Sequence, residues 1–208
     1  MYTLYARKGS GSTVVEAILA ECDIAFERVE VPRSGPAYEA FLKLNPTGKV
    51  PALILPDGSL MTESAAIAIY LAELYPQSGL APLPNSHLRA QYLRCIMYFA
   101  SDVYAANLRY YYSVRYSVDA DAAEGIKQQS AVELEEKLSI FANVLDKGPY
   151  VLGEVYSSAD LYIAMIVSWA PDVKMLFSKH PNIERHYGLV AARPKITPVW
   201  ERNGMLFT

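Results

Sequence analysis

Two serines stand in a glycine-rich hinge near the start of the chain, in the stretch ARKGSGSTVVEAILAE of residues 6–21. Gly9 and Gly11 allow the backbone to turn from a short apolar run into a segment with helical spacing. Ser10 and Ser12 therefore lie at a helix start, where backbone amides and the helix dipole favour negative charge. A hydroxyl placed there can donate a hydrogen bond to an anion and stabilise its charged form. For Ser12 the alternative is that its hydroxyl only caps the helix.

A second group of polar residues opens a later helix. Glu63 and Ser64 precede a segment, residues 64–75, whose apolar side chains recur at helical spacing. Outward-facing amides and a hydroxyl at a helix start suit a carboxylate, and Glu63 can accept a hydrogen bond from an amine. Helix capping alone is the alternative for both residues. In the preceding loop, Pro51 removes one backbone donor just after Val50.

Composition and charge exclude several other kinds of site. The chain has 208 residues, of which 52% are hydrophobic and 20% charged, as in an ordered globular protein. Its formal net charge of -3, without runs of like charge, argues against a nucleic-acid partner. Cys22 and Cys95 form no CxxC motif and have no neighbouring histidine. We expect two reduced cysteines in packed helices, and no metal site.

Membrane insertion and export are not indicated either. The longest apolar run, LYIAMIVSWA, begins at Leu161 and is stopped by Pro171, which is too soon to cross a bilayer. Arg7 and Lys8 follow the first apolar residues, whereas a signal peptide places basic residues before a long apolar core. The sequence therefore favours a cytoplasmic protein.

The elements that must position the polar residues can be read from residues 1–76. Strand-like runs alternate with helical segments, and the turn PDG joins the last two strands as a hairpin. Thr13 and Glu16 have the spacing of a capping box, so the first helix should begin close to Ser12. The order β-α-β-α-β-β-α combines a parallel pair with an antiparallel edge. It predicts an α/β domain with a thioredoxin-like order.

The rest of the chain indicates helices. Residues 77–85 lie in the stretch PQSGLAPLPNS, which has three prolines and no periodicity and is typical of a linker. Beyond it, helical spacing extends over residues 87–112 and 121–146, with shorter helices from Ser157, Asp172 and Asn182. We therefore predict an all-α helical domain over residues 86–208.

The stretch LNPTGKVPALILPDGSLMTESAAIAIYLAELYP, residues 44–76, resembles the cytosolic glutathione S-transferases. That family has an NPxGxVP loop, a strand, a short hairpin and an E-S pair that opens the next helix. GEVYSSADLYIA resembles the family's G-x-x-x-[ST]-x-A-D segment, in which Ser157 would cap a helix and Asp160 would return the bond. HPNIERHYGLVAARP resembles its late helix ending in R-P. The resemblance implies glutathione transferase architecture, a homodimer and a detoxification enzyme of the bacterial, theta- or beta-like kind.

The resemblance also implies that glutathione is the co-substrate. A cis Val50–Pro51 bond, as in the family, would turn the neighbouring amide and carbonyl outward to pair with the peptide as an added strand does. Glu63 and Ser64 would hold the γ-glutamyl end. Lys49, or alternatively Arg33, would meet the other carboxylate.

The same alignment bears on which side chain activates the thiol. The family's tyrosine position falls on Ala6, and the cysteine position of its beta-type members falls on Gly11. Tyr5 is adjacent, but strand alternation would turn it to the opposite face. The serine of theta- and delta-like members aligns with Ser10. Ser12 stays open as a catalytic residue, because a count without gaps can slip by a residue or two.

Aromatic residues in the helical half suit a hydrophobic acceptor. The stretch DVYAANLRYYYSVRY carries Tyr104, Leu108 and Tyr111 at helical spacing, and Trp169 follows in a later segment. Such residues form an apolar wall with polar tips, although packing in a core is their commoner fate. We expect them to contact an electrophile held between the two domains.

The leading hypothesis is a glutathione S-transferase in which a loop serine stabilises the thiolate that attacks a hydrophobic electrophile. One alternative is a non-catalytic binding or regulatory module of the same fold. Another is a glutathione-dependent isomerase, dehalogenase or ether-cleaving enzyme.

Overall fold

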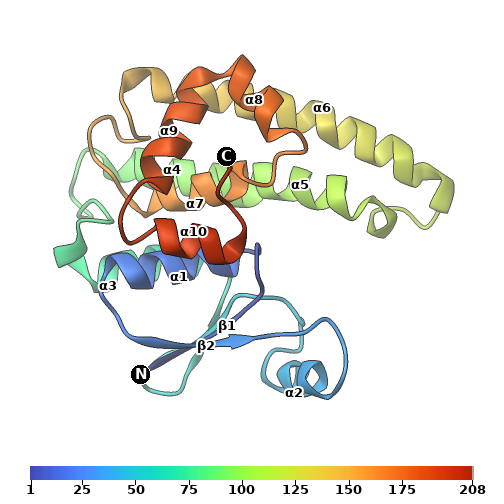
Figure 1. Cartoon of the computed structure of the whole chain (residues 1–208), viewed down its shortest axis with the longest axis horizontal. Helices are drawn as coiled ribbons and strands as arrows, with labels where there is room; N and C mark the ends of the chain where they lie inside the picture. The colour runs from blue at the N-terminus through green and yellow to red at the C-terminus, as the bar shows by residue number, and fades with distance from the viewer. Residues whose placement is uncertain (208) are drawn as a thin grey trace. The chain divides into compact units, whose positions relative to one another are not determined.

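The computed structural model describes residues 1–207, which form two compact units (Figure 1). The first unit joins residues 1–81 to the C-terminal segment that begins at Ala191, and the second comprises Pro82–Val190. The sequence pattern predicts one helical domain over residues 86–208. The contacts instead group the residues from Ala191 onward with the first unit.

A four-stranded mixed sheet forms the centre of the first unit, with strand order β2-β1-β3-β4. Strand β1 is parallel to β2 and antiparallel to β3, and β3 is antiparallel to β4. The elements in chain order are β1 (Tyr2–Ala6), α1 (Ser12–Glu21), β2 (Phe26–Glu30), α2 (Pro36–Leu44), β3 (Ala52–Ile54), β4 (Leu60–Thr62) and α3 (Ser64–Leu74). The predicted thioredoxin-like order is confirmed.

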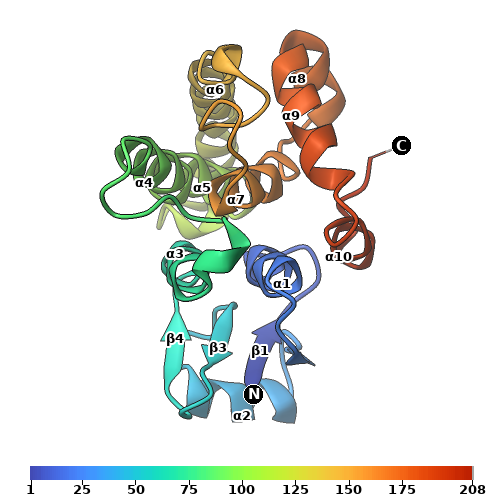
Figure 2. The same cartoon turned by 90° about the vertical axis from the view of Figure 1, so that its left-hand side faces the viewer.

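Helices cover both faces of this sheet. Helices α1 and α3 lie on one face and α2 on the other (Figure 2). Strand β1 has apolar side chains on both faces of the sheet, so both faces need cover. Leu4 and Ala6 are fully buried on one face, and Tyr5 turns to the opposite face. The Tyr5 ring packs against Phe41 of α2, with 5.5 Å between ring centroids. Strand alternation thus removes Tyr5 from the hinge side, as the sequence predicts.

Helix α1 begins at Ser12 as expected, but the predicted capping box is wrong. The N-cap residue is Gly11, and no side chain caps the helix. Thr13 is already the second helical residue, so its hydroxyl lies inside the structure and has no partner among residues 1–207. The Glu16 side chain does not return to the helix start, because it binds Arg28 and the C-terminal segment.

The C-terminal segment adds a helix that the sequence analysis does not single out. Helix α10 (Thr197–Asn203) lies beside α1 (Figure 2). Upstream of it, Arg193 forms an ion pair with Glu21 at 2.6 Å, and Lys195 forms one with Asp23 at the same distance. These contacts hold the segment along the length of α1.

The second unit is helical, and this fold class is confirmed. Its helices in chain order are α4 (Arg89–Tyr98), α5 (Tyr104–Tyr111), α6 (Ala123–Ala142), α7 (Ser158–Val167), α8 (Val173–Lys179) and α9 (Pro181–Ala191), which ends at the first residue of the C-terminal segment. A π-helical turn, Phe99–Val103, joins α4 to α5. Within residues 1–207, no helix combines the length and the apolar character that a membrane span needs.

Every residue of α7 is buried, and its start is tied by the predicted capping box. Asp160 Oδ2 accepts hydrogen bonds from the backbone N–H and the hydroxyl of Ser157, at 2.8 and 3.0 Å. Its Oδ1 accepts from the Val151 N–H at 2.9 Å and lies 3.0 Å from His186 Nε2. The carboxylate therefore joins three segments of the unit, as a structural residue would.

Candidate active site

The two hinge serines contact each other. The hydroxyl oxygens of Ser10 and Ser12 are 2.8 Å apart, and both lie within hydrogen-bond distance of the Arg7 carbonyl, at 2.8 and 3.1 Å. Ser12 is completely buried, and its hydroxyl also accepts from the Arg7 N–H at 3.2 Å. Ser10 is half-buried and accepts from the Ser12 N–H at 3.3 Å.

In this arrangement the Ser10 hydroxyl donates to the Arg7 carbonyl, and the Ser12 hydroxyl is close enough to replace it as the donor to that carbonyl. Each serine has a single O–H to donate. When the Ser12 proton goes to the Ser10 oxygen or to the Arg7 carbonyl, the Ser10 proton is free to turn toward a bound anion. Ser10 can therefore act as a donor beside the start of α1, with Ser12 behind it as the supporting group.

The NPTGKVP loop is shaped by Asn45, a residue that the sequence analysis does not select. Asn45 is 3% exposed; its Nδ2 donates to the Lys49 carbonyl at 2.8 Å and its Oδ1 accepts from the Thr47 hydroxyl at 2.9 Å. The Val50–Pro51 bond that follows is cis. Among residues 1–207, the Val50 backbone makes no loop hydrogen bond with another main-chain group, and Lys49 is exposed. The asparagine of the NPxGxVP motif is the sequence signal that could have identified Asn45.

Glu63 and Ser64 stand where β4 passes into α3. Glu63 is exposed and has a positive φ of 66°, a conformation that residues other than glycine adopt rarely. It occupies the N-cap position, yet no side-chain hydrogen bond caps the helix. Capping therefore does not account for Glu63, and its backbone conformation is typical of a functional position.

The register of the sheet brings these three segments together. Tyr5 of β1 pairs with Ala52 of β3, and Ala52 pairs with Thr62 of β4. The hinge follows Ala6, the residue after Tyr5, while the cis-proline loop enters β3 just before Ala52 and Glu63 follows Thr62. Neighbouring strands are about 4.8 Å apart, so the row spans roughly 10 Å. An extended peptide of three residues has about this length.

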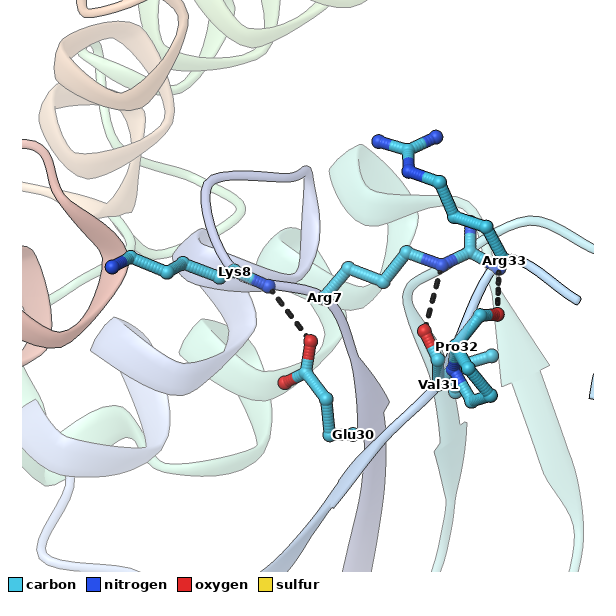
Figure 3. A pocket seen from close by; sticks show the side chains of 6 residues that line it. All are labelled: Arg7, Lys8, Glu30, Val31, Pro32 and Arg33. Atoms are coloured by element: carbon cyan, nitrogen blue, oxygen red, sulfur yellow. Dashed lines mark hydrogen bonds between the residues drawn. The ribbon is translucent and has the colours of Figure 1, made fainter. Parts of the chain in front are cut away.

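A hollow of about 330 Å³ lies beside the hinge, between the ends of β1 and β2 (Figure 3). Its lining residues are Arg7, Lys8, Glu30, Val31, Pro32 and Arg33. The Arg7 guanidinium is engaged, because it donates to the carbonyls of Val31 and Pro32 at 2.9 and 3.2 Å. Arg33, selected from the sequence, extends away from Arg7 at the rim (Figure 3). It adds an exposed positive charge there.

The predicted acceptor residues meet one another within the second unit. The Tyr104 and Trp169 rings are perpendicular, with centroids 5.2 Å apart, and the Tyr111 hydroxyl donates to the Trp169 carbonyl at 2.9 Å. Leu108 lies between the two tyrosines along α5 and is half-buried. Burial raises the pKa of Tyr111, so its hydroxyl stays protonated as a hydrogen-bond donor.

Both cysteines are free thiols, one half-buried and one buried. Burial raises the pKa of Cys22 and raises that of Cys95 to about 11. A protonated thiol is a poor nucleophile, so neither side chain is suited to thiol chemistry at neutral pH. No cluster of metal-ligating side chains is found in the part of the chain that the structure describes.

Known proteins resemble this chain in sequence over almost its whole length. A model of the glutathione S-transferase N-terminal domain matches residues 12–74, and a model of the C-terminal domain matches residues 105–194. The uncharacterized GST-like protein YncG of Escherichia coli is 30% identical, over 99% of this chain and 100% of that protein. The glutathione S-transferase GstA of Escherichia coli is 28% identical, over 90% of this chain and 87% of the relative.

Solved structures match as well. A glutathione transferase homolog from Sulfitobacter with bound glutathione is 27% identical, with a TM-score of 0.88 and 99% of both chains covered. A sphingomonad glutathione S-transferase complexed with glutathione is also 27% identical. Its TM-score is 0.80, with 98% of this chain and 100% of that chain covered.

Proposed function

Since this chain belongs to the glutathione S-transferase family, we propose that it conjugates the thiolate of glutathione to a hydrophobic electrophile. The observation that carries the proposal is the sheet register, which aligns the serine hinge, the cis-proline loop and the start of α3 in one row. A tripeptide thiol of about the row's length can contact all three segments at once. Two similar proteins of known structure contain bound glutathione.

In this proposal, the glutathione backbone pairs with Val50 as an added strand, because the main-chain groups of Val50 are not used by the loop. The γ-glutamyl end binds at Glu63 and Ser64, where the first amides of α3 favour a carboxylate and Glu63 accepts from the amine. The glycyl carboxylate meets Lys49 or Arg33, both of which are exposed cations.

We assign thiolate stabilisation to Ser10. A free thiol has a pKa of about 8.5, and lowering it by about two units requires roughly 2.7 kcal/mol of preferential thiolate stabilisation. A hydrogen bond from the half-buried Ser10 beside the start of α1 supplies part of this energy, and the helix dipole supplies more. Ser12 is completely buried, so it supports Ser10 rather than meeting the sulfur itself.

The acceptor's apolar part is assigned to the apolar wall formed by Tyr104, Leu108, Tyr111 and Trp169. Perpendicular rings with a nearby hydroxyl donor suit a planar molecule that carries a polar substituent. By its family membership, we also expect the enzyme to act as a homodimer.

The test is a glutathione titration followed by ultraviolet thiolate difference absorbance as a function of pH. We expect wild type to form the thiolate at neutral pH. Ser10→Ala should raise the pKa of the bound thiol toward its ordinary value and lower kcat/KM by about a hundredfold, as the loss of one donor to a reacting anion does. Ser12→Ala should have a smaller effect.

Ser101→Ala serves as the matched control, because its exposed hydroxyl lies in the second unit and bonds the Met97 carbonyl at 2.7 Å. Absence of both binding and thiolate in wild type would refute the enzyme. Binding without ionisation would indicate a binding module. Loss of the thiolate in Ser12→Ala alone would move the assignment from Ser10 to Ser12.

A further inference from the structure

Two consecutive backbone amides of the hinge are held by side chains that are remote in sequence. The Lys8 N–H donates to Glu30 Oε1 at 3.2 Å (Figure 3), and the Gly9 N–H donates to Asn203 Oδ1, also at 3.2 Å. These are the two amides that directly precede Ser10. The C-terminal helix α10 therefore reaches the segment that carries the proposed catalytic hydroxyl.

The two acceptors are connected to each other through α1 and β2. Asn203 Nδ2 donates to Glu16 Oε2 at 3.1 Å, and Arg28 Nε donates to the same oxygen at 3.3 Å. Arg28 also donates to Glu30 Oε2 at 2.6 Å. The hydrogen bonds thus form a closed polar ring: hinge, Asn203, Glu16, Arg28, Glu30 and back to the hinge.

Burial makes the Asn203–Glu16 part of this polar ring rigid, whereas Glu30 is exposed. Glu16 is 1% exposed and Asn203 3%, so each would lose hydrogen bonds that water cannot replace if the ring opened. The buried carboxylate is compensated by Arg28 and by Arg202, whose Nε is 2.7 Å from Glu16 Oε1. Asn203 is further fixed by a bond from its Nδ2 to the Val199 carbonyl at 2.9 Å.

The conformation of Gly9 determines where Ser10 points. Gly9 has a φ of 65°, and a free glycine visits many other conformations at little cost. The bond from its N–H to Asn203 selects one of them, and Ser10 is the next residue. A displacement of about 1 Å at a reacting group can lower a rate by about a hundredfold.

We infer that Asn203, anchored by the buried Glu16, is a positioning residue that holds the hinge in the conformation that presents the Ser10 hydroxyl to the glutathione sulfur. The inference rests on the proposed function for its chemical consequence. Its structural part, the immobilisation of the hinge by α10, can be measured without glutathione.

The first experiment compares Asn203→Leu with Lys195→Met by amide hydrogen exchange. Lys195 lies on the same C-terminal segment, but it bonds the other end of α1, through Asp23 and the Glu21 carbonyl at 2.6 and 3.1 Å. We expect Asn203→Leu to speed exchange over residues 7–12 and Lys195→Met to leave it unchanged. Equal exchange over residues 7–12 in wild type and Asn203→Leu overturns the inference.

The second experiment moves the buried carboxylate from position 16 to position 203. Asn203→Asp alone places two carboxylates in contact, which is unfavourable in a buried site. Combined with Glu16→Gln, the site again holds a single carboxylate near Arg28 and Arg202, and this carboxylate still accepts from the Gly9 N–H, although the bond to the Val199 carbonyl is lost. We expect kcat/KM at neutral pH to fall about tenfold or more in Asn203→Asp and to recover in part in the double variant.

The thiolate titration separates positioning from folding. In Asn203→Leu the pKa of bound glutathione should rise as it does in Ser10→Ala, whereas Lys195→Met should match wild type. Faster hinge exchange with an unchanged thiol pKa overturns the positioning of Ser10, as does a double variant that folds without recovering the rate. A wild type that never ionises glutathione refutes the proposed function instead, and the exchange rates still decide whether Asn203 holds the hinge.

Discussion

Glu63 combines a strained backbone with an exposed carboxylate. Its φ of 66° is costly for a residue with a Cβ, by about 1–3 kcal/mol, and glycine would adopt it with less strain. No side-chain cap compensates for the strain. A binding role for the carboxylate would explain why glutamate stands here instead of glycine. In our proposal, this carboxylate binds the amine of glutathione.

Glu63→Gly should therefore separate stability from binding. We expect the free energy of unfolding to rise by about 1 kcal/mol as the strain is relieved, and the glutathione Kd to increase because the carboxylate is lost. Urea unfolding and calorimetric titration measure the two quantities. Gln129→Gly, at an exposed position of α6 in the second unit, is the control and should cost about 1 kcal/mol without changing the Kd. Unchanged glutathione affinity in Glu63→Gly would contradict the binding assignment.

Helix starts in this protein differ in how they are capped. The sequence suggests a capping box for both α1 and α7, yet only α7 has one. At α7, Ser157 is the N-cap residue, so its side chain and that of Asp160 face the free amides. At α1, the helix begins one residue earlier than the threonine, so the same spacing places Thr13 inside the helix.

Asp160 should be more important for stability than an ordinary helix cap. Asp160→Ala leaves the Val151 and Ser157 amides without their buried acceptor, so we expect a loss of about 3 kcal/mol or more in the free energy of unfolding. Asp172→Ala removes the exposed cap of α8, a bond from the Met175 N–H at 2.9 Å, and should cost about 1 kcal/mol. Equal losses in the two variants would show that the buried network contributes little.

At the scale of the whole molecule, the first unit is discontinuous in sequence. Residues from Ala191 onward pack with residues 1–81, and both Trp200 of α10 and Ile196 just before this helix are fully buried. The end of the chain thus helps to form the unit that carries the candidate site. Loss of these late residues should affect α1 and the hinge, although they are remote in sequence.

Trp200→Ala and Trp200→Phe test this organisation. The alanine variant leaves a large cavity and should cost about 3–5 kcal/mol, with faster hydrogen exchange in α1. The phenylalanine variant keeps most of the ring and removes an indole N–H that has no partner among residues 1–207, so its effect should be small. Normal α1 exchange in a folded Trp200→Ala protein would show that α10 is not required by the first unit.

The sequence by itself determines the order of elements and the motif residues. Alternating and helical spacing predict β1 to α3 correctly, because burial of one face repeats at the period of each element. Motif letters identify the cis-proline loop and the pair Glu63–Ser64. The spacing of Ser157 and Asp160 identifies the capping box, since a box is formed by residues close in sequence.

Only the tertiary structure decides which hydroxyl is exposed and what holds it. Ser10 and Ser12 are two residues apart and chemically identical, and packing alone makes one half-buried and the other inaccessible. The bond from Gly9 to Asn203 joins residues at opposite ends of the chain. Local sequence patterns do not predict such a contact, because its partners meet only after the C-terminal segment has packed against α1.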